Sequence, residues 1–299
     1  MGNVIDISSA KTNVDVVKHP TRFGVTLKMG PGSASRISPT WTMAGWRLQF
    51  VRLISGDSLL LDQSAGAVFV KVIEGALASP HRRTYPAVGD VVTTRLAQPV
   101  ISAGSEGALL SVYTRTPAAP PAVQQMNQLV VNGPMAEAFA WQSFEQRYNA
   151  YTPFFNGTDA HLVPGFHLLD NDGAEIAYVF FWTAGKGVDL STHNHGNTPN
   201  PDAPAFAEVH QVLYNGTGTG GMYSTPEPGA AERHRLPMFV GEEHGPFFVI
   251  TGNGTAKLRE NGAVEYPWHG WQAGQDGLPG QAYDLVCAYE ITAPYAKVV

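Results

Sequence analysis

Residues 189–223 read DLSTHNHGNTPNPDAPAFAEVHQVLYNGTGTGGMY, and this stretch decides how the rest of the chain is interpreted. It contains His193, His195, Glu208 and His210, followed by a glycine-rich turn. The chain has ten histidines, and six of them lie between residues 193 and 269. Imidazole and carboxylate groups are ligands of Zn, Fe, Mn and Ni. Because residues two apart on a strand point to the same side, His193 and His195 can face one interior point.

The run FAEVHQVLY, residues 206–214, has the composition of a strand. Its alternation places Glu208 and His210 on the same face as Phe206 and Val212. A carboxylate and an imidazole are costly to bury on an apolar face unless they are paired or bound to a metal. A single histidine would be interpreted as a solvent-facing loop residue, but this combination favours a metal site.

This arrangement resembles the first motif of the cupin superfamily. In that motif two histidines spaced His-x-His are followed by a glutamate on the next strand and by a glycine turn. The resemblance implies a metal site that includes His193, His195 and Glu208. The gap before Glu208 is longer than in the motif, because residues 196–207 are inserted. This insertion is rich in Pro and Asn, so we expect a loop lying over the site.

The second cupin motif supplies one more histidine after a proline and a glycine. PMFVGEEHGPF, residues 237–247, matches that outline and implies His244 as the fourth ligand. A rival is YPWHGW, residues 266–271, which contains His269 close before the last strand. We expect His244 to bind the metal, and His210 and His269 to lie at the cavity wall as acid/base groups. Glu243 is a further candidate base, although a Glu-Glu pair usually lies in a solvated turn.

Several residues near these motifs are candidates for contact with the substrate. Trp268 and Trp271 taken alone would be interpreted as core, but they flank His269 and follow Tyr266, which favours an aromatic wall. The expected substrate-binding residues are Trp268, Trp271, Tyr266, Phe247 and Asn197.

Composition limits the class of protein. The chain has 299 residues, of which 43% are hydrophobic and 15% charged, so it can bury a large core. The net charge of −6 argues against nucleic acid and anionic membranes as partners. One cysteine, Cys287, excludes an internal disulfide and suits a reducing compartment. It lies in the apolar run YDLVCAYEI, so we expect it to be an inert core residue. The sequence shows no signal peptide pattern and no apolar run that spans a bilayer. We therefore expect a cytoplasmic protein, a homodimer, with a small-molecule substrate.

The chain divides into four expected segments. Residues 1–20 form an arm. Residues 21–118 form a degenerate cupin-like barrel without metal ligands. Its short expected strands include PVISA, residues 99–103, and GALLSVYTR, residues 107–115, and turn signals such as Glu74-Gly75 separate its strands. Residues 119–160 form a helical connector, whose clearest helix is PMAEAFAWQSFEQRYNAY, residues 134–151. Residues 161–299 form the metal-binding barrel, in which Asn261-Gly262 predicts a hairpin. The expected fold is thus all-β with a helical connector: two cupin-like double-stranded β-helix, or jelly-roll, barrels.

A closer resemblance concerns activity. The segments FAEVH, NGTGTGGMY, GEEHGPFF and YPWHGWQAG resemble the cupin portion of aldos-2-ulose dehydratase-type proteins. The resemblance implies a lyase or isomerase that acts on a small sugar-like or keto-hydroxy substrate. Its cofactor would be one divalent metal ion (Zn, Fe(II), Mn or Ni), which stabilises an enediolate. Two alternatives stay open: a non-haem Fe(II) dioxygenase that cleaves a ring or a C–C bond, and a non-catalytic sugar-binding bicupin.

Overall fold

The computed structural model contains strands and no helix in the part of the chain that it describes. That part comprises residues 2–18, 24–43, 46–62, 64–78, 91–93, 100–115, 155–156, 160–185, 189–193, 206–215, 221–232, 234–235, 248–251, 256–258, 265–266, 268–272 and 282–292. No helix within these ranges is long and apolar enough to cross a membrane. The expected all-β class is confirmed for the described residues, whereas the expected helix at 134–151 lies outside them.

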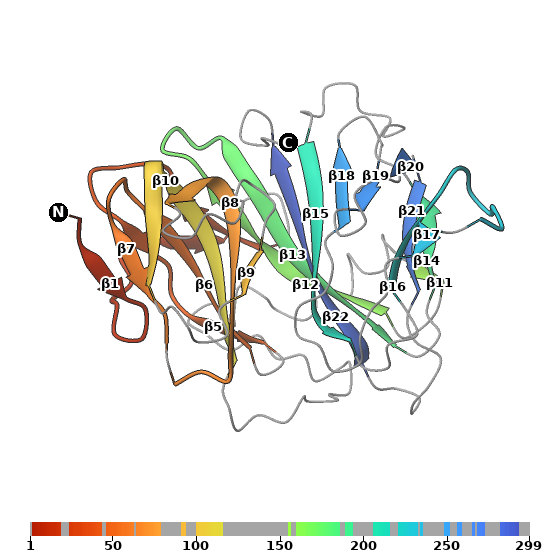
Figure 1. Ribbon diagram of the computed structural model, residues 1–299, viewed down its shortest axis with the longest axis horizontal. Coiled ribbons are helices and arrows are strands. Elements are labelled where there is room, and N and C mark those ends of the chain that lie inside the picture. The colour runs from red at the N-terminus through yellow and green to blue at the C-terminus, as the bar shows by residue number, and fades with distance from the viewer. Residues whose placement is uncertain are drawn as a thin grey trace.

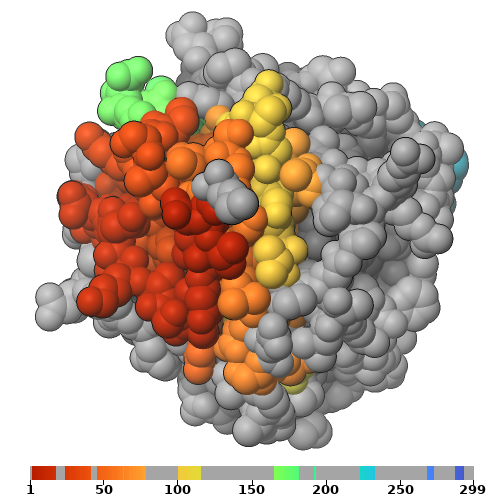
Figure 2. Space-filling model, turned by 60° about the vertical axis from the view of Figure 1, so that its left-hand side comes forward, coloured from red at the N-terminus to blue at the C-terminus, as the bar shows by residue number. Residues whose placement is uncertain are grey.

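Eight strands of the first half of the chain form one sheet. Its members are β1 (Val4–Asp6), β4 (Arg36–Ile37), β5 (Trp41–Met43), β6 (Trp46–Leu53), β7 (Ser58–Leu60), β8 (Ala67–Ala78), β9 (Val91–Thr93) and β10 (Val100–Arg115). The long strand β10 pairs with β6, β7 and β8, all antiparallel. Figure 2 shows these strands lying together on one side of the molecule.

A nine-stranded sheet joins the two ends of the chain. In spatial order its strands are β2 (Val16–Lys18), β3 (Gly24–Lys28), β12 (Ala160–Leu169), β13 (Glu175–Gly185), β22 (Ala282–Thr292), β15 (Phe206–Asn215), β18 (Phe248–Thr251), β19 (Ala256–Leu258) and β20 (Glu265–Tyr266). Strand β3 pairs parallel with β12, so residues near the N-terminus complete a sheet of the second half. The antiparallel pair β19–β20 agrees with the hairpin that Asn261-Gly262 predicts.

A five-stranded sheet contains the remaining strands. They are β11 (Phe155–Asn156), β14 (Asp189–His193), β21 (Trp268–Gln272), β16 (Gly221–Thr225) and β17 (His234–Arg235), in this spatial order. In Figure 1 the nine-stranded sheet lies between the eight-stranded sheet and the five-stranded sheet.

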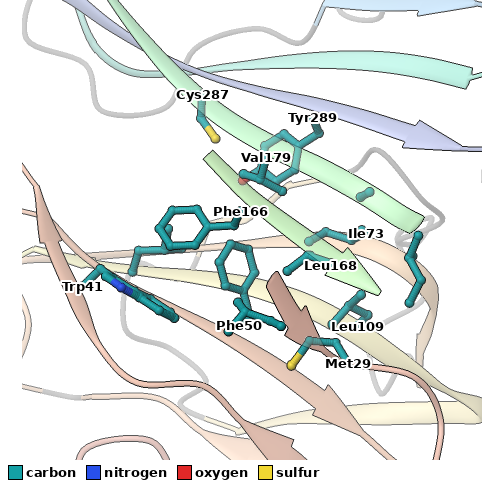
Figure 3. Close-up of a cluster of buried hydrophobic side chains, with 14 of the residues drawn as sticks. Met29, Trp41, Phe50, Ile73, Leu109, Phe166, Leu168, Val179, Cys287 and Tyr289 are labelled. Atoms are coloured by element: carbon teal, nitrogen blue, oxygen red, sulfur yellow. The ribbon is translucent and has the colours of Figure 1, made fainter. Parts of the chain in front are cut away.

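The main core lies between the eight-stranded and nine-stranded sheets. Phe166 on β12 packs against Trp41 and Phe50, with ring centroids 4.7 and 5.2 Å apart. Figure 3 shows side chains of both sheets pointing toward one another in this layer. A second core covers the other face of the eight-stranded sheet, because alternate residues such as Leu109 and Leu110 belong to opposite faces.

A polar cluster is buried within the main core. Ser111 Oγ is 2.8 Å from Tyr289 Oη, and Tyr113 Oη hydrogen-bonds both Tyr289 Oη and, at 3.1 Å, the Cys287 thiol. Lys71, also fully buried, has its Nζ 5.5 Å from the centroid of the Tyr289 ring. The inert core role expected for Cys287 fits this setting, and the hydrogen bonds tie β10 to β22 across the two sheets.

Two strand boundaries differ from those expected. Glu74-Gly75 is not a turn between strands but lies inside β8, and residues 100–115 form one strand rather than two. The register between β8 and β10 shifts between Ala103 and Ala108, which marks a bulge. Gly75 has a φ of 76°, which a bulge accommodates without ending the strand. The strands β1 and β2 lie within residues 1–20, the segment expected to form an arm.

Candidate functional site

His193 and His269 occupy opposed positions on paired strands. Strand β14 pairs antiparallel with β21, and the register places His193 opposite His269 after an irregularity that follows Leu190. On its other side β21 pairs with β16, which places Ser224 opposite His269. The sequence separates the two histidines widely, but the fold makes them cross-strand neighbours.

His269 is completely buried, as is Ser224 beside it. Ser224 Oγ has no hydrogen-bond partner among the described residues. On the next pair of the same strands, Tyr223 lies opposite Gly270 and its hydroxyl is 3.2 Å from Thr192 Oγ1 on β14. Because Gly270 has no side chain, nothing on β21 stands between Tyr223 and Thr192. This contact ties together the two strands on either side of His269.

Glu208 and His210 lie on β15, in the nine-stranded sheet, which lies beside the five-stranded sheet in Figure 1. The register places Glu208 opposite Glu290 of β22 and His210 opposite Ala288. The structure describes the backbone of β15, so the side-chain roles expected for Glu208 and His210 stay predictions.

The other expected site residues divide into two groups. Trp271 is buried with 1% of its surface exposed, and Trp268 is half-buried. Tyr266 lies on β20. The remaining predicted residues lie outside the described part of the chain: His195, Asn197, Glu243, His244 and Phe247.

Sequence reasoning did not single out a group of polar residues on β12, β13 and β22. His167 is fully buried, and its Nδ1 is 2.6 Å from Glu175 Oε2. Its ring stacks on Tyr178 with centroids 4.4 Å apart. Tyr178 in turn lies opposite Glu290. The available signal was the alternation of these polar residues with apolar ones along each strand.

The β14–β21 register brings two imidazole-bearing residues to opposed positions, and imidazole is a ligand that divalent transition metals accept. Among the described residues, no group of three His, Cys, Asp or Glu side chains is close enough to hold a metal ion. The ligand roles expected for His193, His195, Glu208 and His244 stay predictions.

A family model described as the aldos-2-ulose dehydratase/isomerase (AUDH) cupin domain matches residues 11–292. The chain belongs to the AUDH cupin family. This confirms the cupin resemblance seen in the sequence, and it accounts for the all-β architecture.

One relative in the AUDH cupin family is the protein named aldos-2-ulose dehydratase from Phanerodontia chrysosporium. It is 31% identical over 212 residues, which cover 64% of this chain and 23% of that protein. The chain therefore matches less than a quarter of the length of this relative.

Several solved structures resemble the chain at low identity. Hazelnut (Corylus avellana) vicilin matches with 12% identity and a TM-score of 0.27, covering 94% of this chain and 84% of that one. Oxalate decarboxylase from Bacillus subtilis, whose Mn(II) centres are known, matches with 10% identity and a TM-score of 0.27, covering 96% and 79%. Salicylate 1,2-dioxygenase from Pseudaminobacter salicylatoxidans matches with 12% identity and a TM-score of 0.28, covering 83% and 71%. Because these TM-scores are low, we draw no conclusion from the similarities.

Proposed function

We propose that this protein is a metal-dependent enzyme of the lyase or isomerase type that acts on a small sugar-like or keto-hydroxy substrate. Membership of the AUDH cupin family and the relative named aldos-2-ulose dehydratase support this reaction class. The observation that carries the proposal is the β14–β21 register, which makes His193 a cross-strand neighbour of the buried His269.

The proposed metal ligands are His193, His195, Glu208 and His269. This set differs from the sequence expectation, which assigned the last position to His244. Directly opposed residues of an antiparallel pair lie on the same face, with Cβ atoms about 5 Å apart. Two imidazoles at such positions can bind one ion. The cross-strand position therefore favours His269 over His244, which was assigned from its spacing along the chain.

The five-stranded sheet and the nine-stranded sheet supply the two walls of the proposed second barrel. His193 and His269 belong to the first of these sheets, and Glu208 belongs to the second. In the first half, the sequence between residues 21 and 160 has one histidine, His81, and no His-x-His pair. We therefore assign catalysis to the second barrel, and packing to the first.

The reaction needs a base beside the substrate carbonyl. The base removes a proton from a carbon next to the carbonyl. The hydroxyl on the following carbon then takes up a proton and leaves as water, so the net reaction is the loss of one water. A divalent cation bound at the site would supply charge stabilisation for the enediolate oxygens. His210 and Glu243 are the proposed proton-transfer groups of this chain. A histidine suits this task because its pKa lies close to neutral pH.

The test combines metal analysis with a turnover assay. The purified protein should contain one divalent ion per chain. It should convert a hexos-2-ulose to an unsaturated product without oxygen, as followed by ultraviolet absorbance. Chelation should abolish turnover, and the metal should restore it. Turnover that requires oxygen uptake would instead identify a dioxygenase, and binding without turnover would identify a sugar-binding protein.

A further inference from the structure

One row of polar residues crosses four neighbouring strands of the nine-stranded sheet. The register pairs His167 of β12 with Tyr178 of β13, Tyr178 with Glu290 of β22, and Glu290 with Glu208 of β15. Directly opposed residues share a face of the sheet. The row therefore extends from the proposed metal ligand Glu208 across three strands.

The other face of the same strands is apolar. Phe166, Val179 and Tyr289 are the next residues along β12, β13 and β22, and they belong to the main core. Tyr178 and Glu290 are half-buried, so they lie on the face that the core does not occupy. Both strands are internal to the sheet, so this face of β13 and β22 is flanked by further strands on both sides.

The phenol of Tyr178 is held in place from several sides. Its ring stacks on His167 at 4.4 Å and 15°, and on Phe180 at 5.1 Å and 22°. Glu175 fixes His167 through the 2.6 Å contact to Nδ1. Gly165 leaves room for the ring, because a Cβ atom there would lie 2.4 Å from Tyr178 Cε2. A side chain fixed in this way is organised before any ligand binds.

We propose that Tyr178 and Glu290 bind the hydroxyl groups of a polyhydroxylated carbonyl substrate, and that His167 and Glu175 position Tyr178. This inference deepens the proposed function and rests on it. Neighbouring strands lie about 4.8 Å apart, so Tyr178 stands roughly 10 Å from Glu208, within reach of a six-carbon sugar that extends from the metal site. A phenol donates and accepts a hydrogen bond, and a carboxylate accepts from two hydroxyls.

A purely structural polar layer is the competing explanation for this row, since His167 is fully buried and Tyr178 and Glu290 are half-buried. That explanation predicts that Tyr178 and Glu290 have no effect on substrate binding. The proposed role predicts an effect that fades with distance from Glu208 along the row. Thr26 of β3 lies opposite His167, beyond the positioned group, and its hydroxyl already donates to the Val17 carbonyl. Thr26→Val is therefore a matched control.

The experiment measures the binding of a hexos-2-ulose by calorimetry, and its KM and kcat, in full-length metal-loaded variants. Tyr178→Phe keeps the stacked ring and loses the hydroxyl, so affinity should fall about fivefold. Glu290→Gln should cost about tenfold to a hundredfold. Both changes should appear mainly in KM, with metal content unchanged. Thr26→Val should bind like the wild type.

A monodeoxy hexos-2-ulose sharpens the test. The wild type should bind the analogue that lacks the contacted hydroxyl more weakly than the intact sugar. Tyr178→Phe should bind both sugars equally, because this variant has already lost the contact, and the double-mutant cycle then assigns the loss to this one interaction. Variants that all bind like an active wild type would overturn the inference and leave the proposed function standing. An equal loss in Thr26→Val would also overturn it. A wild type that binds neither metal nor the hexos-2-ulose would overturn both.

Discussion

At the scale of single residues, burial sets the chemistry of Cys287. Burial raises the pKa of its thiol from about 9 to about 12, although hydrogen bonds from Tyr113 and Tyr289 oppose the shift. Burial also raises the pKa of the Tyr113 and Tyr289 phenols well above their usual value. These groups are neutral at physiological pH, which suits a structural cluster rather than a nucleophile.

The raised pKa of Cys287 predicts alkaline destabilisation. Well below pH 9 the thiol keeps its proton in both folded and unfolded chains, so stability does not depend on it. Between about pH 9 and 12 only the unfolded chain releases the proton, so the free energy of unfolding falls as pH rises. Between pH 8 and 10.5 the thiol alone should cost about 2 kcal/mol. Urea unfolding at both pH values checks this, and Cys287→Ala should show a smaller difference. Equal wild-type stabilities would contradict it.

At the same scale, His-x-His and Glu-x-His were recognisable because imidazole and carboxylate groups are unusual in an apolar strand. The strand that lies beside β14 was not recognisable, because spacing along the chain does not report how distant strands pair. The structure pairs β14 with β21 and so places His193 opposite His269. Which histidine completes the metal site stays a prediction.

At the scale of elements, bulges keep long strands continuous where the sequence suggested turns. A glycine in the sequence is typical of both a turn and a bulge, because both can require a residue with positive φ. Glu74-Gly75 was therefore assigned to the wrong class, although the strands around it were recognisable from their apolar alternation. The choice between turn and bulge depends on the partner strand β10, which lies far along the chain.

The irregularity in the β8–β10 pairing beside Gly75 predicts a local requirement for glycine. In Gly75→Ala the new Cβ would lie 2.3 Å from the Gly107 carbonyl oxygen, at a φ of 76°. We expect a loss of about 1–3 kcal/mol in the free energy of unfolding. Gly173→Ala is the matched control, because its φ is 90° and no atom lies within 4 Å of the added Cβ. Urea unfolding of both variants measures the difference. Equal losses would show that the close contact does not matter.

At the scale of the whole molecule, one core joins the first and second halves. Trp41 and Phe50 come from the eight-stranded sheet, and Phe166 and Phe181 come from the nine-stranded sheet. The amount of β structure was predictable from composition and turn signals. The parallel pairing of β3 with β12 was not, because residues 24–28 carry no signal for a partner so far along the chain.

The shared core predicts cooperative unfolding. Phe166 is 3% exposed and contacts both Trp41 and Phe50, so Phe166→Ala should cost about 3–5 kcal/mol. Far-ultraviolet circular dichroism and tryptophan fluorescence should report one shared transition in the wild type and in the variant. Val17→Ala, at a site 59% exposed, should change stability little. Two separate transitions would show that the halves do not share one core.

We propose that the metal site is built on the β14–β21 pair, with His269 rather than His244 as its last ligand. The test is the metal content per chain of the wild type, His269→Ala and His244→Ala, measured after dialysis against a metal-buffered solution. Circular dichroism checks that each variant is folded. We expect His269→Ala to lose the metal and His244→Ala to keep it, because losing a ligand weakens binding steeply. Metal retained in His269→Ala and lost in His244→Ala would show that His244 is the ligand instead.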